Sequence, residues 1–443
     1  MCGFFFTTDK DSLRDTGFED VLQRGWNKTE YEHENYFGIQ SILPAWSGDI
    51  QLIDNDDVLF FYTGEVYNCG RYGYDSDTDF VLDTILNNRS RINKLDGMFA
   101  FVLYIKATDT LIIGRDKTGQ IPLFVYNKDK LIVSNTIKSI VKNVDTKVKS
   151  TAFNTWQQHK HYISQQTPWE DIDEFPAGKL WVNGVYSNIT GPDRNSIGIL
   201  NTLEHLRWHY KSPLPMATVN SGGVDSGVIS KVWNEQEVSI NHVGKDYISN
   251  NQSRAIEINE TQWCEYVDRF IEDTYMVPYT WSWIGYYIMG EYLRKYQINV
   301  LLTGEGADEI FGGYPGYAQG VPTPYSGFTE HNRPIENKLS DQKVFIPVAA
   351  MGANLALGCH TIEPRSPFLD STFLNNENYR ACVNKEELKS IYTHFYGKQP
   401  DPKQGFAGFP NEYYNHVVGT NLAEFENDNY WKEACLQTLR NLT

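Results

Sequence analysis

Short hydrophobic runs follow one another closely in the first third of the chain, with few helical stretches between them. The runs are rich in β-branched and aromatic residues, which is the composition of buried strands. Strands spaced this closely predict a sandwich of antiparallel sheets. The predicted strands are Tyr36–Leu43, Val58–Tyr62, Leu95–Tyr104, Thr110–Asp116, Ile121–Tyr126 and Lys130–Ser134.

One helix is expected within this region. Asp75–Asp79 has the residues of a helix cap, and Val81, Ile85 and Leu86 would form the apolar face of the helix. The preceding stretch, Thr63–Asn68, is expected to be a turn that opens a helix or a loop.

The pattern changes beyond Gly191–Ser196, a turn-forming stretch that we interpret as a linker. A helix is expected at Leu200–His209, and strands are expected near 217–220, 238–243, 255–258 and 298–302. A chain of 443 residues is long enough for two domains. The linker divides it into residues 1–190 and 191–443.

The composition narrows the class of protein. The formal charge of −17 argues against a nucleic-acid-binding surface, which needs clustered Lys and Arg. No apolar run reaches the roughly 18 residues of a membrane span, and no secretory signal precedes the fold. The six cysteines are dispersed without a CxxC pair, which favours free thiols, no zinc site and a cytoplasmic location.

The most informative stretch is Ser221-Gly-Gly-Val-Asp-Ser226, which predicts a tight turn between a buried strand and a helix. Gly222 and Gly223 can adopt positive φ and let the backbone approach a ligand closely. Backbone N–H groups at the helix N-terminus, with the two serine hydroxyls, would form an anion site. Asp225 fits such a site if it holds Mg²⁺, which proteins bind with one or two carboxylates plus phosphate oxygens. The alternative is an ordinary capped turn.

A second motif, Thr303-Gly-Glu-Gly-Ala-Asp-Glu309, follows the last of the expected strands. It places Glu305 and Asp308 at the C-terminal edge of a strand, where open α/β sheets bind ligands. Asp308 can share Mg²⁺ with Asp225, and Glu305 can take a proton from an attacking amine. The alternative is a helix cap with acidic residues in its first turn.

Cys2 follows the initiator Met, which is usually removed before a small residue. The thiol would then lie beside its own α-amino group, which titrates at about pH 8 and can act as a general base. The alternative is a buried cysteine at the start of an edge strand, and Cys2 alone favours that alternative.

A series of motifs in the first 178 residues resembles the N-terminal-nucleophile glutaminase domain of the glutamine-dependent asparagine synthetases. The resemblance implies an αββα fold, attack of Cys2 on the glutamine side-chain amide, and binding of the glutamine α-amino group by Glu65 and Asp77. The motifs are, in order, Cys2, Arg24-Gly25, Gly64–Asn68, Ser76-Asp77, Asp96–Phe101, Gly114–Asp116, Gly119, Ile121–Leu123 and Glu174–Gly178.

Two positions depart from that family's pattern. Thr63 precedes Gly64 and Glu65 where the family has Asn-Gly-Glu. That Asn helps to form the oxyanion hole, and loss of one such donor can cost roughly 100-fold in rate or more. The Thr63 hydroxyl can still donate, so Thr63 and Gly64 are predicted to act with Cys2. Gln40 is the best match to the family's Arg that binds the glutamine carboxylate.

The second half resembles the synthetase domain of the same family, an ATP pyrophosphatase of the N type. The resemblance implies an α/β domain with a parallel sheet flanked by helices, and ATP and Mg²⁺ as cofactors. It implies pyrophosphate binding by the Ser221–Ser226 loop, Thr303 and Gly304. It also matches Lys403 to a phosphate-binding lysine and Asp246 to a carboxylate that binds metal and phosphate. Arg365 matches a position with a structural role.

The resemblance thus implies the activity of a glutamine-hydrolysing asparagine synthetase, in which ammonia passes through a tunnel and displaces AMP from an acyl adenylate. The expected partners are small-molecule substrates: glutamine, ATP, and aspartate or another carboxylate. A homodimer is the expected assembly. Val277–Ile288, which corresponds to an acceptor-lining segment, contains no Arg to hold an α-carboxylate. One alternative is therefore that the acceptor is not aspartate. Trp281 and Trp283 would suit a larger, flatter acceptor, unless they are core aromatics. A regulatory protein with an inactive glutaminase is the other.

Overall fold

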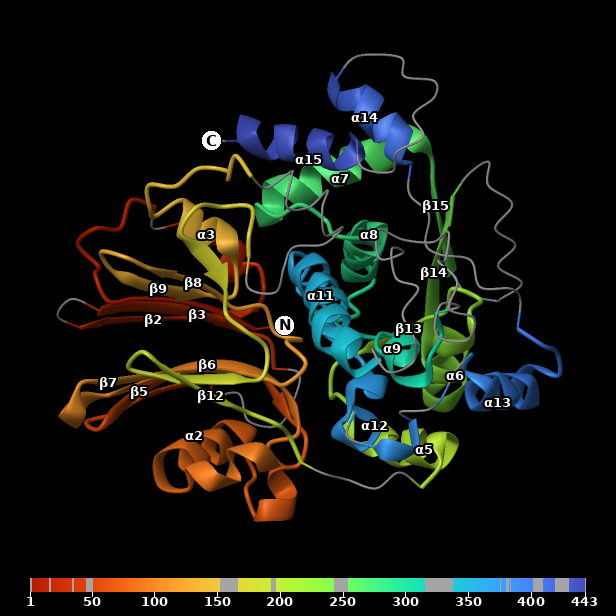
Figure 1. Cartoon of the computed structure of the whole chain (residues 1–443), viewed down its shortest axis with the longest axis horizontal. Helices are drawn as coiled ribbons and strands as arrows, with labels where there is room; N and C mark the ends of the chain where they lie inside the picture. Colours follow the sequence, from red (N-terminus) through yellow and green to blue (C-terminus); the bar gives the residue numbers. More distant parts are fainter. Residues whose placement is uncertain are drawn as a thin grey trace.

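In the computed structural model, the described residues form two six-stranded antiparallel sheets and one five-stranded parallel sheet, with helices around them (Figure 1). The residues that the structure describes are 2–15, 17–33, 36–44, 51–151, 166–192, 197–242, 254–314, 338–374, 376–379, 382, 384–400, 409–418 and 430–442.

The two antiparallel sheets stack on each other, and both are built from strands of the first half of the chain. The first sheet has the order β10 (Ile172–Glu174), β8 (Phe124–Asn127), β9 (Leu131–Ser134), β1 (Gly3–Thr7), β3 (Tyr36–Ile42), β2 (Asn27–His33). The second has the order β12 (Val185–Asn188), β11 (Lys179–Val182), β7 (Thr110–Arg115), β6 (Gly97–Ile105), β5 (Val58–Val66), β4 (Leu52–Asp54).

Alternation of side chains along the strands creates a layer of core on each side of a sheet. Phe4 and Phe6 of β1 pack between the two sheets, whereas Phe5 packs on the outer face of the first sheet. Helices α1 (Glu19–Leu22) and α3 (Ile137–Val141) cover that outer face, and α2 (Asp77–Asn87) covers the outer face of the second sheet (Figure 1). The predicted αββα sandwich is confirmed.

Three local features differ from the sequence-based interpretation. Only Tyr67 and Asn68 of the predicted turn Thr63–Asn68 form a turn, which leads into a short 3-10 helix, whereas Thr63–Val66 continue β5 and pair with Gly97–Ala100 of β6. Leu86 is 37% exposed and lies off the buried face of α2. Finally, β1 lies between β9 and β3, so Cys2 precedes a central strand rather than an edge strand.

The second half of the chain forms the parallel sheet, as predicted, with every pair of neighbouring strands parallel. Its order is β15 (Arg254–Ile258), β14 (Gln236–His242), β13 (Met216–Val219), β16 (Val300–Leu302), β17 (Glu363–Arg365). The helices around it are α5 (Ile199–His209), α6 (Val224–Trp233), α7 (Glu260–Thr274), α8 (Trp281–Lys295), α9 (Ala307–Phe311), α11 (Lys338–Gly358), α12 (Ser371–Leu374), α13 (Glu386–Tyr396), α14 (Pro410–Val418) and α15 (Tyr430–Asn441).

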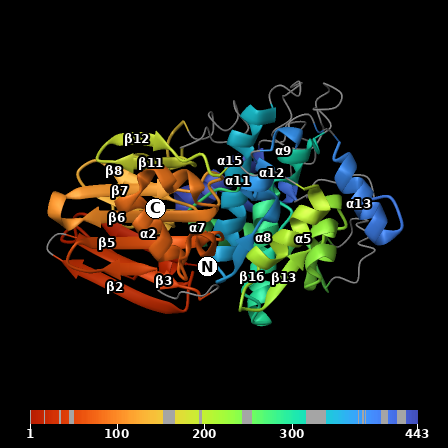
Figure 2. The same ribbon diagram turned by 90° about the horizontal axis from the view of Figure 1, so that it is seen from below.

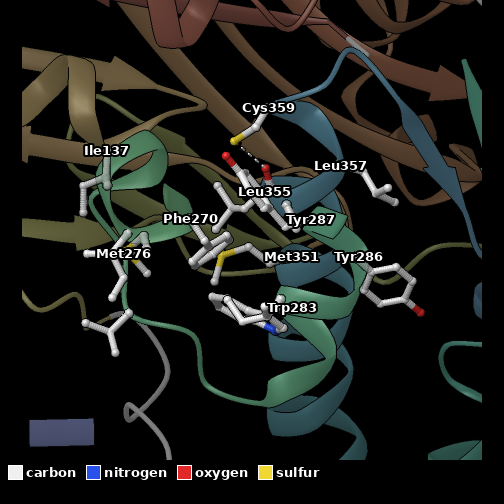
Figure 3. Packing of buried hydrophobic residues seen from close by; sticks show 14 of the residues in the cluster. Ile137, Phe270, Met276, Trp283, Tyr286, Tyr287, Met351, Leu355, Leu357 and Cys359 are labelled. Carbon is white, nitrogen blue, oxygen red and sulfur yellow. Dashed lines mark hydrogen bonds between the residues drawn. The ribbon is translucent and has the colours of Figure 1, made fainter. Parts of the chain in front are cut away.

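The sandwich and the parallel sheet lie on opposite sides of α8 and α11 (Figures 1 and 2). One continuous hydrophobic cluster includes Ile137 of α3, Phe270 of α7, Trp283 of α8 and Met351 of α11, as Figure 3 shows. The two halves are therefore packed together through a shared apolar core. Among the helices that the structure describes, none is both long enough and apolar enough to span a bilayer.

Candidate active sites

The two glycine-rich motifs of the second half lie side by side at one edge of the parallel sheet. The Ser221–Ser226 loop follows β13, and the loop beginning at Thr303 follows β16. A Cβ placed on Gly304 would lie 3.0 Å from the Asp225 Cβ, so the two loops are in contact. The order of strands reverses between β13 and β16, which is the switch point where open α/β sheets bind ligands.

The Ser221–Ser226 loop has the strand-turn-helix geometry expected of it. Gly222 has a φ of +80°, whereas Gly223 has a φ of −75° and does not need glycine's freedom. The Ser221 N–H donates to Ser226 Oγ at 3.1 Å, and the two hydroxyl oxygens are 3.0 Å apart. The N-terminus of α6 therefore opens onto the sheet edge, where its first N–H groups can meet an anion.

Lys385 joins the carboxylates of the two loops. Its ammonium group donates to Asp225 Oδ2 and lies 2.7 Å from Asp308 Oδ1. Burial lowers the pKa of Lys385, but the two carboxylates outweigh burial and raise the pKa above its usual value. The carboxylates of Asp225 and Asp308 thus both contact the same positively charged group, the Lys385 ammonium. This arrangement fits a divalent cation held by two carboxylates and phosphate oxygens.

The conformation of Lys385 is imposed by tertiary contacts. Its φ is +53°, a left-handed value that is uncommon for a residue other than glycine. Its N–H donates to the Phe311 carbonyl, and a Cβ on Gly313 would lie 2.1 Å from the Lys385 Cε. Sequence reasoning missed Lys385. The Gly312-Gly313 pair was a signal that something approaches the backbone closely there, but it did not indicate which residue.

Glu305, the predicted proton acceptor, is held by a tyrosine of α8. The Tyr286 hydroxyl donates to Glu305 Oε1 at 2.5 Å. Thr303 is buried, and its hydroxyl lies 2.8 Å from the Ser366 hydroxyl. Sequence reasoning named neither Tyr286 nor Ser366. Trp283 is fully buried in the core, which favours a packing role for this aromatic.

Two predicted residues of this site, Lys403 and Asp246, lie outside the described residues. Within the described parts of the chain, no group of three or more His, Cys, Asp or Glu side chains is arranged to hold a metal ion.

Cys2 lies at the boundary between the sandwich and the parallel-sheet half. Its thiol is 4% exposed and accepts a hydrogen bond from the Leu43 N–H at 3.2 Å. Arg24 donates to the Cys2 carbonyl at 3.1 Å and to Asn354 of α11, which ties the start of β1 to the second half. Burial raises the pKa of the thiol to about 12, although the N-terminal amine and the backbone hydrogen bond act in the opposite direction.

Glu65 and Asp77, predicted to hold the glutamine amine, are both buried. Burial raises the pKa of Asp77 to about 6, although its carboxylate accepts hydrogen bonds from the Tyr62 hydroxyl and the Val66 N–H. Burial and the neighbouring Glu363 raise the pKa of Glu65 well above its usual value.

Arg365 of β17 brings a positive charge from the second half to this site. It lies 3.7 Å from Glu65 and donates to Glu363 at 2.8 Å. A guanidinium therefore lies where the resemblance would place the α-ammonium of glutamine. The sequence motif had indicated only a structural role for Arg365.

Thr63 and Gln40, the two departures from the family pattern, are also buried. The Thr63 hydroxyl has no hydrogen-bond partner among the described residues, so it is available to donate. Gly64 has a φ of +127°, and a Cβ there would lie 2.0 Å from the Met98 carbonyl oxygen, so only glycine fits. The Gln40 amide N–H donates to the Tyr62 carbonyl of the other sheet.

Comparison with known proteins agrees with both halves of this description. The family model described as a glutamine amidotransferase domain matches residues 52–188, and the model described as asparagine synthase matches residues 204–326. A solved structure, "Structure of the allosteric regulatory enzyme of purine biosynthesis", aligns with 90% of this chain and 96% of that chain at a TM-score of 0.29 and 12% identity.

Three curated proteins that are similar to this chain are asparagine synthetases. Asparagine synthetase [glutamine-hydrolyzing] 1 of Bacillus subtilis (strain 168) is 24% identical, over 88% of this chain and 70% of the relative. Asparagine synthetase B [glutamine-hydrolyzing] of Escherichia coli (strain K12) is 26% identical, over 74% of this chain and 64% of the relative. Asparagine synthetase [glutamine-hydrolyzing] 1 of Saccharomyces cerevisiae (strain ATCC 204508 / S288c) is 23% identical, over 81% of this chain and 69% of the relative.

The two family models and the curated relatives indicate the class of glutamine-dependent carbon–nitrogen ligases, with a region similar to glutamine amidotransferase domains followed by a region similar to asparagine synthase. Within that class the chain is a homologue of the glutamine-hydrolysing asparagine synthetases, at modest identity over most of its length.

Proposed function

We propose that the protein converts ATP, L-aspartate, L-glutamine and water to L-asparagine, L-glutamate, AMP and pyrophosphate. One observation carries the synthetase half of this proposal, namely the convergence of Asp225 and Asp308 at the switch point of the parallel sheet. We assign glutamine hydrolysis to residues 1–190 and amide formation to residues 191–443, with ammonia passing between them. A cytoplasmic location and a homodimer belong to the same proposal.

In the glutaminase half, Cys2 Sγ attacks the side-chain amide carbon of glutamine. Burial raises the pKa of the thiol above its usual value, which favours the protonated form. A base must therefore take its proton as the carbon–sulfur bond forms, and the α-amino group of Cys2 supplies that base once Met1 is removed. The Thr63 hydroxyl and the Gly64 backbone stabilise the oxyanion.

Glutamine is held in this site by its charged ends. Glu65 and Asp77 bind the α-ammonium group, which competes with the Arg365 guanidinium for Glu65. Gln40 binds the α-carboxylate through the second N–H of its side-chain amide, since the first donates to the Tyr62 carbonyl. Because an amide carries no charge, Gln40 binds a carboxylate more weakly than an Arg would.

In the synthetase half, the Ser221–Ser226 loop, Thr303 and Gly304 bind the phosphates of ATP, and Lys403 contributes a further positive charge. Asp225 and Asp308 would hold Mg²⁺, which neutralises phosphate charge when it is bound. Lys385, which contacts both carboxylates, would bring a further positive charge near the bound phosphates. Glu305 accepts a proton from the ammonia that attacks the acyl adenylate, and AMP leaves.

The acceptor is tested directly with ammonia as the nitrogen donor. Purified protein, ATP, Mg²⁺ and a panel of carboxylic acids are incubated, and the products are measured by mass spectrometry. Aspartate-dependent formation of AMP, pyrophosphate and asparagine supports the proposal. ADP and phosphate as products would refute the pyrophosphatase assignment. AMP formation with a different acid would show that this acid, and not aspartate, is the acceptor. That outcome is compatible with the absence of Arg in the sequence Val277–Ile288.

A further inference from the structure

Two adjacent tyrosines of α8 are both buried in the same hydrophobic cluster, but their hydroxyls have different partners. The Tyr287 hydroxyl donates to Asp273 of α7 within the core. Tyr286 projects from another side of the helix, with its hydroxyl directed away from Tyr287 and Trp283 (Figure 3). Both rings therefore pack in the core, whereas the Tyr286 hydroxyl faces the synthetase site.

The Tyr286 hydroxyl is part of a polar chain that joins three elements. It donates to Glu305 Oε1 at 2.5 Å, and it also has a hydrogen bond with the Thr303 side chain. The Thr303 hydroxyl lies in turn 2.8 Å from the Ser366 hydroxyl, just after β17. A hydroxyl from α8 thus fixes one carboxylate oxygen of a residue in the loop after β16.

The electrostatic setting keeps Tyr286 as a donor. Burial and the neighbouring Glu305 raise the pKa of the phenol well above its usual value, and these effects outweigh the hydrogen bond from Thr303. The hydroxyl is therefore protonated throughout the physiological pH range. It brings no charge, so unlike a lysine or an arginine it orients the carboxylate without forming an ion pair that would strongly reduce its basicity.

We propose that Tyr286 is a positioning residue for the amide-forming step: it holds Glu305 Oε1 so that Oε2 faces the ammonia attacking the acyl adenylate. The inference rests on the proposed role of Glu305 as proton acceptor. In this step the ammonia nitrogen bonds to the acyl carbon and the bond from that carbon to the AMP oxygen breaks. A proton passes from nitrogen to Glu305, and AMP leaves with the electron pair.

Loss of the Tyr286 hydroxyl should affect only one of the two steps of synthesis, which are adenylation of the acceptor and amide formation. Adenylation consumes ATP and releases pyrophosphate before a proton acceptor for ammonia is needed. Loss of the Tyr286 hydroxyl should therefore slow amide formation more than adenylation. The acyl adenylate that is not captured by ammonia is then lost to water, and AMP accumulates without an equal amount of amide.

The test compares Tyr286→Phe with Tyr287→Phe, which is the same chemical change at the neighbouring, core-facing position. With ammonia, aspartate and ATP, Tyr286→Phe is expected to lower kcat for asparagine roughly tenfold or more, which is part of the roughly 100- to 10,000-fold that a general base contributes. Its KM values for ATP and aspartate and its rate of ATP–pyrophosphate exchange should change less than about twofold, so the ratio of asparagine to AMP falls. Tyr287→Phe should keep the wild-type ratio.

Glu305→Gln supplies the second comparison. If Tyr286 acts through Glu305, the double variant Tyr286→Phe/Glu305→Gln should be no slower than Glu305→Gln alone. A wild-type asparagine-to-AMP ratio in Tyr286→Phe, a proportional loss of exchange and synthesis, or additive losses in the double variant would each overturn the inference. Failure of the wild-type protein to form asparagine would instead refute the proposed function, and with it this role.

Discussion

Replacement of Lys385 by Met is the sharpest test of the proposed cation site. The Lys385 ammonium is 5% exposed, and it lies 2.7 Å from Asp308 Oδ1 and within hydrogen-bonding distance of Asp225. At an effective dielectric constant of about 20, two unit charges at that separation attract by roughly 6 kcal/mol. Desolvation offsets part of this attraction, so removing one member of such a buried pair costs about 3–5 kcal/mol.

The expected result is a free energy of unfolding lower by about 3–5 kcal/mol in buffer containing EDTA, measured by urea denaturation. The pKa of Lys385 is raised in the folded protein. Its contribution to stability is therefore fully present below the unfolded lysine pKa of about 10.4 and is lost only as pH rises through the folded value. Measurements at pH 7.5 thus record the whole effect.

Magnesium should restore much of the loss, because a divalent cation can take the place of the ammonium between the two carboxylates. At about 100 times its dissociation constant, Mg²⁺ would stabilise the variant by roughly 2.7 kcal/mol. The wild-type protein without nucleotide should respond less. Lys389→Met is the matched control, since Lys389 is only half-buried in the same region, and its ammonium group donates to Asn384 rather than to a carboxylate. Equal effects of Mg²⁺ on Lys385→Met and wild type would refute the two-carboxylate site.

Three further predictions concern the glutaminase half. Cys2→Ala should abolish glutamine-dependent synthesis and leave ammonia-dependent synthesis intact, and retention of Met1 in active protein would contradict the proposed base. Because the pKa of Asp77 is raised to about 6, its carboxylate is lost as pH falls through that value, so KM for glutamine should rise below about pH 6. A flat KM between pH 5 and 7 would argue against Asp77 as an ammonium ligand. Thr63→Asn should raise glutaminase kcat, by up to roughly 100-fold if the oxyanion hole lacks a donor; no change would mean that another donor already serves.

Tertiary pairing explains the local errors of the sequence reasoning. Thr63, Gly64 and Glu65 have turn-forming character, but β6 offers a ladder of hydrogen-bond partners as far as Gly97, so the strand continues. Gly64 is needed there for close passage past Met98 rather than for a turn. Propensity is a weak prior, and an available partner strand overrides it.

The sequence alone determined the features that depend on neighbours in the chain. Closely spaced runs of β-branched and aromatic residues predicted the sandwich, and the residues from 217 to 230 predicted a strand, a tight turn and the start of a helix, because each pattern needs only a few consecutive residues. Tertiary structure decided which of these segments meet. Lys385 reaches Asp225, Tyr286 reaches Glu305, and Arg365 reaches Glu65 only because the order of the strands and the packing of α8 bring them together. A lone lysine, tyrosine or arginine carries no local signal of a partner 19 to 300 positions away, since that contact is set by the fold and not by the residues beside it.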